Sequence, residues 1–217
     1  MTEQGPENKY PVNATLSLTV MKMKTGLVLF VWLLFAAANV FSQDTSFYIF
    51  LCFGQSNMER FPGVEEQDKT ADNRLQVLAA VDFPNIGRKN WSWYPAVPPL
   101  CRDSTGLCPA DYFGRTLVLK LPANIKVGII NVSVAGSKIE LFDKTNYLSY
   151  ASTAPSWMSG IINAYNGNPY GHLVEMGKLA QKDGVIKGIL LYQGESNTND
   201  KDWPLKVKVI YDDLIRD

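Results

Sequence analysis

An apolar run that ends at a short polar turn is the feature that most constrains the fold of this chain. Residues 46–53 (SFYIFLCF) are aromatic and aliphatic enough to form a strand buried in a parallel sheet. The next residues, GQSNM at 54–58, carry Ser56 two positions after a glycine. Open α/β sheets place ligands and nucleophiles at this carboxyl end of their strands. Ser56 is therefore either an exposed nucleophile beside an oxyanion site or a residue that only caps the next segment.

The rest of the chain alternates between strand-like and helix-like segments. Strands are predicted at 75–81, 126–132 and 186–192, and helices at 111–120, at 170–182 and from 202 onward. This alternation predicts a mostly parallel sheet with right-handed crossovers. Residues 83–109, rich in proline, tryptophan and glycine, are predicted to form a long surface excursion.

Three of the predicted strands end in a polar loop that contains a glycine, at Gly54, Gly136 and Gly194. Because the carboxyl ends of parallel strands lie on one edge of a sheet, these loops can converge. A single Gly-Ser turn is weak evidence of chemistry, but three such loops on one edge describe a site.

Composition describes one ordinary globular domain. The chain has 217 residues, 46% hydrophobic and 19% charged. Lys+Arg and Asp+Glu both number 21, so no net basic field favours a nucleic-acid partner.

Residues 1–42 are predicted to lie outside the folded domain. The basic stretch at 21–24 and the apolar run at 27–40 are typical of a secretory signal peptide that begins at Met21 or Met23 and ends at Ser42. In that case translation begins at Met21 or Met23, and residues 1–20 come from a start codon assigned too far upstream. The alternative is a membrane anchor, although the apolar run is short for a span of about 20 residues. We therefore expect a secreted or periplasmic protein without stable membrane association after cleavage.

The cysteines and the histidine bear on redox state and metals. Cys101 and Cys108 flank a turn-rich loop that could close a small disulfide, which leaves Cys52 as a buried thiol. With one histidine and no Cys/His cluster of ligand spacing, no metal site and no cofactor are predicted.

The motifs resemble those of the SGNH-type hydrolases, within the branch of sialate O-acetylesterases and carbohydrate esterase family 6 acetyl xylan esterases. The matching segments are GQSNM at 54–58, Gly136-Ser137 and QGES at 193–196, in the family's order, and the resemblance spans roughly residues 47–217. It implies an α/β fold, a flavodoxin-like three-layer α/β/α sandwich. It also implies removal of O-acetyl groups from acetylated oligo- or polysaccharides, such as xylan or sialic acid.

The resemblance also implies roles for individual residues. Ser56 matches the nucleophile and, through its N–H, one oxyanion donor, and Gly136 matches a second backbone donor. The third donor is a side-chain amide, here Gln193 or Asn197. Glu195 either holds its loop or orients the catalytic histidine, and we favour the structural role. Gln55, Asn57 and Arg60 are the implied substrate-binding residues, and Arg60 stands where relatives commonly have glycine.

One part of the family pattern is missing. The family places its base in a late Asp-x-x-His motif, whereas the one histidine here, His172, precedes the strand predicted at 186–192. His172 matches no base motif and is expected to be a surface or helix-start residue. The last predicted helix also reaches residue 217 without a stop signal. We therefore expect residues 43–217 to be an incomplete esterase domain with near-zero turnover by itself, because its Ser56 lacks a base.

Two other functions are compatible with the residues. A non-catalytic carbohydrate-binding remnant of the same fold would use Trp91, Trp93 and Tyr94 as stacking surfaces, although these rings are as well suited to packing on the core. A flavodoxin-like binder of phosphate or flavin is disfavoured, because no loop carries a glycine-rich phosphate cradle. The oligomeric state is not encoded in any recognisable pattern.

Overall fold

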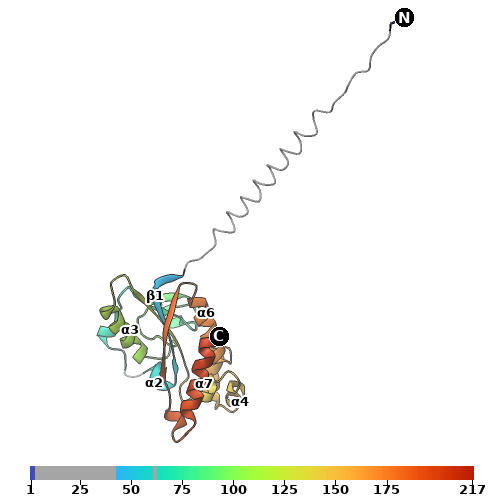
Figure 1. Ribbon diagram of the computed structural model, residues 1–217. Helices are drawn as coiled ribbons and strands as arrows, with labels where there is room; N and C mark the ends of the chain where they lie inside the picture. Colours follow the sequence, from blue (N-terminus) through green and yellow to red (C-terminus); the bar gives the residue numbers. More distant parts are fainter. Residues whose placement is uncertain (3–42, 61–62) are drawn as a thin grey trace. The chain divides into compact units, whose positions relative to one another are not determined.

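The computed structural model describes residues 1–2, 43–60 and 63–217 (Figure 1). The predicted over-extended start and signal peptide fall almost wholly outside the described residues. Within the described ranges, no helix has both the length and the apolar character needed to cross a bilayer.

A five-stranded, mostly parallel sheet forms the centre of the described domain. Its strands are β1 (Asp44–Gly54), β2 (Leu75–Leu78), β3 (Trp93–Pro95), β4 (Lys126–Ser133) and β5 (Gly184–Tyr192), in the order β3-β2-β4-β1-β5. β1 runs parallel to both β4 and β5, β2 runs parallel to β4, and β3 pairs antiparallel with β2 at one edge. The strands predicted at 46–53, 126–132 and 186–192 are confirmed within two residues, whereas β2 is shorter than predicted.

Helices cover both faces of the sheet, which confirms the three-layer α/β/α architecture (Figure 1). The helices are α2 (Ser56–Glu59), α3 (Pro109–Lys120), α4 (Tyr147–Ser152), α5 (Ser156–Ala164), α6 (Pro169–Ala180) and α7 (Trp203–Arg216). Short 3-10 turns lie at Glu66–Lys69, Pro84–Ile86, Ile139–Phe142 and Glu195–Asn197. Figure 1 shows α3 on one side of the sheet and α6 and α7 on the other.

Alternation along the central strands divides the core between these two layers. In β1, Ile49 and Leu51 pack with the α5, α6 and α7 side, whereas Cys52 packs with the α2 and α3 side. In β4, Ile130 belongs to the first layer and Ile129 to the second. Because side chains alternate between the faces of a strand, an almost continuous apolar run serves both layers.

The segment 83–109 is not the surface excursion that its composition predicts. It contains β3 and several buried residues, among them Phe83, Leu100 and Leu107. The buried Arg88 guanidinium makes this burial possible, because it donates hydrogen bonds of 2.6–3.1 Å to the carbonyls of Pro95, Val97 and Pro99. Backbone groups that would otherwise need water are satisfied inside the protein.

Cys101 and Cys108, whose spacing left a disulfide open, are both free and buried, and Cys52 is a buried thiol as expected. Each thiol has partners of its own. The Cys101 sulfur lies 3.3 Å from the Tyr165 hydroxyl, and the Cys108 sulfur accepts a hydrogen bond from Asn131 Nδ2. Burial raises the pKa of Cys108 to about 12, so this thiol remains protonated and unreactive near neutral pH.

Candidate active site

The three predicted loops meet at the carboxyl edge of the sheet. Gly54, the last residue of β1, pairs in register with Ser133 of β4 on one side and Tyr192 of β5 on the other. The chain passes very close to β5 here, since a Cβ on Gly54 would come within 2.1 Å of the Tyr192 carbonyl oxygen. Gly54 also has a φ of +155°, which L side chains rarely adopt. A glycine is therefore required immediately before the Ser56 turn.

Ser56 is the first residue of α2, half-buried at the end of β1. Its carbonyl accepts the N–H of Arg60, which closes the short helical turn at 3.0 Å. Among the described residues, no hydrogen bond engages the Ser56 hydroxyl or the backbone N–H of Ser56 or of Gly136. The family resemblance implies that these groups are the nucleophile and the two backbone donors, and these roles stay predictions.

Gln55 links the first loop to the third. Its side chain is buried, and its Oε1 accepts hydrogen bonds from Gln193 Nε2 at 3.2 Å and from the Ser196 N–H at 3.3 Å. The Gln55 N–H in turn donates to the Tyr192 carbonyl at 3.1 Å. The contacts of Gln55 thus hold loops together, while its predicted role in binding substrate stays a prediction.

Asn57 and Glu195 form a second link between the same loops. Asn57 Nδ2 donates to Glu195 Oε1 at 2.5 Å, and both side chains lie at the surface of the site. This contact joins the first and third loops, while the role of Glu195 stays a prediction. Arg60 is exposed at the end of α2.

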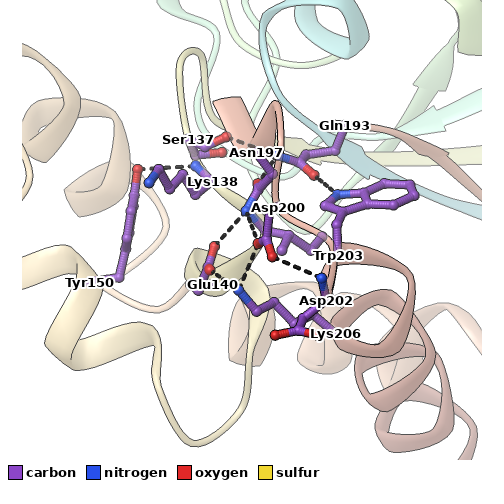
Figure 2. Close-up of polar contacts among 11 residues, drawn as sticks. Ser137, Lys138, Glu140, Tyr150, Gln193, Asn197, Asp200, Asp202, Trp203 and Lys206 are labelled. Carbon is purple, nitrogen blue, oxygen red and sulfur yellow. Dashed lines mark hydrogen bonds and ion pairs between the residues drawn. The ribbon is translucent and has the colours of Figure 1, made fainter. Parts of the chain in front are cut away.

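Gln193 and Asn197, the two candidate amide donors, lie in one buried network (Figure 2). The Trp203 indole N–H donates to Gln193 Oε1 at 2.6 Å, which turns Gln193 Nε2 toward Ser137 O and Asn197 Oδ1. Asn197 Nδ2 instead donates to the carboxylates of Glu140 and Asp200.

Lys206 completes this network, since its Nζ lies 2.7 Å from both the Glu140 and the Asp200 carboxylates (Figure 2). Hydrogen bonds to these two acids raise the pKa of Lys206. α7 is thereby joined to the loops after β4 and β5, and the Gln193 amide has a fixed orientation.

A buried ion pair beneath the second loop was not anticipated from the sequence. Glu59, 1% exposed, lies 3.0 Å from the Arg102 guanidinium and accepts the Ala135 N–H at 2.6 Å. Arg102 also donates to the Ser133 carbonyl at 2.7 Å. Burial raises the pKa of Glu59, while Arg102 and the Ala135 N–H oppose that shift. The pair ties α2, which begins at Ser56, to the backbone immediately before Gly136.

His172 lies in the first turns of α6, as predicted, but it is buried rather than at the surface. Its ring is 4% exposed and lies between Trp91 and Tyr165, at centroid distances of 5.1 and 5.4 Å. Its Nε2 lies 2.6 Å from the Ala80 carbonyl and donates to it, which leaves Nδ1 buried without a partner among the described residues. None of these contacts is with a residue of the three loops.

Burial of His172 predicts acid sensitivity of the fold. Burial lowers the pKa of His172, although the Ala80 carbonyl and Glu175 oppose the shift. In the unfolded chain His172 has a pKa of about 6.5, so below this pH the unfolded chain binds a proton that the folded chain excludes. The free energy of unfolding therefore decreases as the pH is lowered from about 6.5 to the pKa of His172 in the folded protein. Urea unfolding between about pH 7 and 5 is expected to show this loss, and a smaller loss in His172→Gln. Equal slopes for the two proteins would contradict the assignment.

Trp91, Trp93 and Tyr94, suggested above as stacking surfaces for a sugar, pack against other residues of the protein. Trp93 lies against Phe47 at 4.8 Å between centroids, and its indole N–H donates to Asp183, which precedes β5. These residues mark the amino end of β1 and β5, opposite to Ser56. Trp91 packs on His172, and Tyr94 packs against the core on the α3 side.

In the described ranges, no three His, Cys, Asp or Glu side chains lie close enough together to hold a metal ion. The site is built instead from a serine hydroxyl, backbone N–H groups, side-chain amides and one surface carboxylate.

The described domain is an α/β/α fold with a serine after β1 and polar loops after β4 and β5, the arrangement that the resemblance to SGNH-type hydrolases implies. The sequence model of the "carbohydrate esterase, sialic acid-specific acetylesterase" family matches residues 46–217. The chain belongs to this carbohydrate esterase family, which confirms the resemblance seen in its motifs.

Solved structures share the architecture at low sequence identity. An Arabidopsis thaliana protein aligns with a TM-score of 0.56 at 18% identity, over 77% of this chain and 67% of that one. The protein NanS aligns with a TM-score of 0.55 at 17% identity, over 81% of this chain and 62% of NanS. A carbohydrate acetylesterase from Xanthomonas citri aligns at 0.49 with 21% identity, over 76% and 38% of the two chains. The first two show that the fold is shared, and this chain spans about two thirds of their length.

Proposed function

We propose that this chain carries the nucleophile and oxyanion-binding part of a serine esterase that removes O-acetyl groups from carbohydrate, with acetylated sialic acid and xylan as candidate substrates. The observation that carries the proposal is the convergence of the three family motifs at one sheet edge, linked by hydrogen bonds through Gln55 and Ser196. Membership of the carbohydrate esterase family supports the acetyl-ester chemistry.

In this mechanism the Ser56 hydroxyl oxygen attacks the acetyl carbonyl carbon while a base accepts the hydroxyl proton. The N–H groups of Ser56 and Gly136 then donate to the carbonyl oxygen as it becomes negatively charged. The proton passes to the departing sugar oxygen, and the acetyl group stays on Ser56. Water releases acetate in a second, equivalent step. Losing one such donor costs about 3 kcal/mol of transition-state stabilisation in well-studied hydrolases.

For the third donor we propose Gln193 rather than Asn197. Gln193 Nε2 contacts the side chain of Gln55, the residue before Ser56, and Trp203 fixes the direction of its amide. Gln193 Nε2 donates to Gln55 and Ser137 at 3.2 Å and to Asn197 Oδ1 at 2.7 Å, whereas Asn197 Nδ2 donates to the Glu140 and Asp200 carboxylates at 3.0 and 3.1 Å. Of the two amides, Gln193 is thus the one held next to the residue that precedes Ser56.

We further propose that the base is a histidine that this sequence does not contain. The one histidine, His172, is enclosed by Ala80, Trp91 and Tyr165. Residues 43–217 are therefore expected to hydrolyse p-nitrophenyl acetate at close to the buffer rate. An extended form, continued through the downstream reading frame to include a late histidine, is expected to be active.

Comparison of these two forms in the same assay tests the proposal. Robust hydrolysis by residues 43–217 that Ser56→Ala abolishes would show that the base lies within the chain. Inactivity of both forms, or a stop codon directly after Asp217 that leaves no extended form, would favour a carbohydrate-binding remnant of the same fold.

A further inference from the structure

The indole ring of Trp157 lies directly against Gly136. A Cβ on Gly136 would come within 2.7 Å of Trp157 Cη2 and 3.4 Å of Met158 Cε. Gly136 also has a φ of +68°, in the left-handed region that favours glycine. The residue whose N–H is a proposed oxyanion donor therefore has an aromatic ring as its immediate neighbour.

Trp157 is displayed to solvent although the helix that carries it is anchored in the core. Its side chain is 56% exposed, whereas Met158 and Ile162 of the same helix, α5, are buried. The Met158 sulfur also accepts a weak hydrogen bond from the Tyr150 hydroxyl at 3.8 Å. Because α5 is fixed by these neighbours, the position of the Trp157 ring beside Gly136 is set by the fold.

We propose that Trp157 is a substrate-binding residue that stacks against the sugar ring of the acetylated substrate. An acetyl ester joins its carbonyl to the sugar through a single oxygen, so the sugar of an ester whose carbonyl oxygen accepts the Ser56 and Gly136 N–H groups must lie close to Gly136. The π face of an aromatic ring is electron-rich and attracts the weakly positive C–H face of a sugar ring. This inference rests on the proposed function, and it assigns to Trp157 the aromatic surface that Trp91, Trp93 and Tyr94 do not provide.

A purely structural role for Trp157 makes a different prediction. If the ring only shields the Gly136 backbone, its loss would disturb the oxyanion donor and slow the hydrolysis of every ester equally. A stacking role affects substrates with a sugar ring and spares p-nitrophenyl acetate.

Binding to the chain carrying Ser56→Ala, which removes turnover, provides the first test. O-acetylated N-acetylneuraminic acid and acetylated xylo-oligosaccharide are titrated by isothermal titration calorimetry into every variant. In the protein that keeps Trp157, its indole N–H is also followed by NMR, with the signal assigned by its loss in Trp157→Phe. Trp157→Leu keeps an apolar cover over Gly136 but removes the π face, and it is expected to weaken binding of at least one saccharide about tenfold. Trp157→Phe is expected to retain most of the affinity. Tyr211→Leu, a matched change at an aromatic residue 52% exposed on α7, is expected to have no effect.

Kinetics of the extended form provide the second test. Trp157→Leu is expected to raise KM for the acetylated saccharide about tenfold and to change kcat/KM for p-nitrophenyl acetate less than about twofold. Equal saccharide binding by all variants, or an equal loss on both substrates, would overturn the proposal. If the extended form hydrolysed no ester, the proposed function would fail, and the binding titration would still decide the role of Trp157.

Discussion

Ser56→Ala in the extended form is expected to lower the rate of p-nitrophenyl acetate hydrolysis by about four to six orders of magnitude. Ser56 begins α2 at the edge where Gly54, Ser133 and Tyr192 lie in register, and the change removes the oxygen that would form the acyl intermediate. The backbone N–H remains, so binding of the ester should change little. Steady-state kinetics should therefore show a large fall in kcat with a nearly unchanged KM.

Ser152→Ala is the matched control, because Ser152 is an exposed serine of α4 whose hydroxyl bonds only the Ser149 carbonyl among the described residues. Its activity should equal that of the unmodified protein. Comparable activity in Ser56→Ala and Ser152→Ala would mean that Ser56 is not the nucleophile.

Arg102→Met is expected to lower the free energy of unfolding by about 3–5 kcal/mol. Methionine fills a similar volume but leaves the Glu59 carboxylate buried without its cation. It also removes the donor to the Ser133 carbonyl. An uncompensated buried charge costs far more than a lost surface pair. Urea unfolding followed by circular dichroism measures the loss.

The double variant Glu59→Met with Arg102→Met separates the charge from the packing. An apolar pair of similar volume removes the uncompensated carboxylate, so the double variant is expected to be more stable than Arg102→Met alone. If Arg102→Met does not fold, recovery of folded protein in the double variant would likewise show that the uncompensated Glu59 carboxylate causes the loss of stability. A cost below about 1 kcal/mol for Arg102→Met would contradict the ion pair.

The elements that carry the site could be predicted because local patterns specify them. The apolar run that ends at Gly54 forms β1, and the glycine-containing loops after β4 and β5 reach the same edge, as parallel pairing requires. Proline and aspartate near residue 202 marked the start of α7 within one residue. In each case the signal lies within a few neighbouring residues.

Features that depend on contacts between residues far apart in the sequence were missed or wrongly predicted. Glu59 and Arg102 are far apart in the sequence, and no local pattern predicts that they form a buried ion pair. The hydrogen bond from the Ala135 N–H to Glu59 is equally unpredictable from neighbouring residues. His172 stands at the start of a predicted helix and matches no base motif, which suggested a surface position, yet Trp91 and Tyr165 enclose it. The short spacing of Cys101 and Cys108 suggested a disulfide, but each thiol has a separate buried partner. Tertiary packing decided all three outcomes.

The sequence did not single out Trp157. It follows Pro155 and Ser156 at the start of α5, a helix that was not predicted, and the exposure of its ring is known only from the structure. Its proximity to Gly136 depends on how α5 packs against the loop after β4, which only the structure shows.

Release of acetate from O-acetylated N-acetylneuraminic acid, compared between the extended form and its Ser56→Ala variant, tests the central claim most directly. We predict steady acetate release by the extended form and none above the buffer rate by the variant. Acetate release that Ser56→Ala leaves unchanged would contradict the placement of the nucleophile. Hydrolysis of p-nitrophenyl acetate without acetate release from this sugar or from acetylated xylan would contradict the assignment as a carbohydrate acetylesterase.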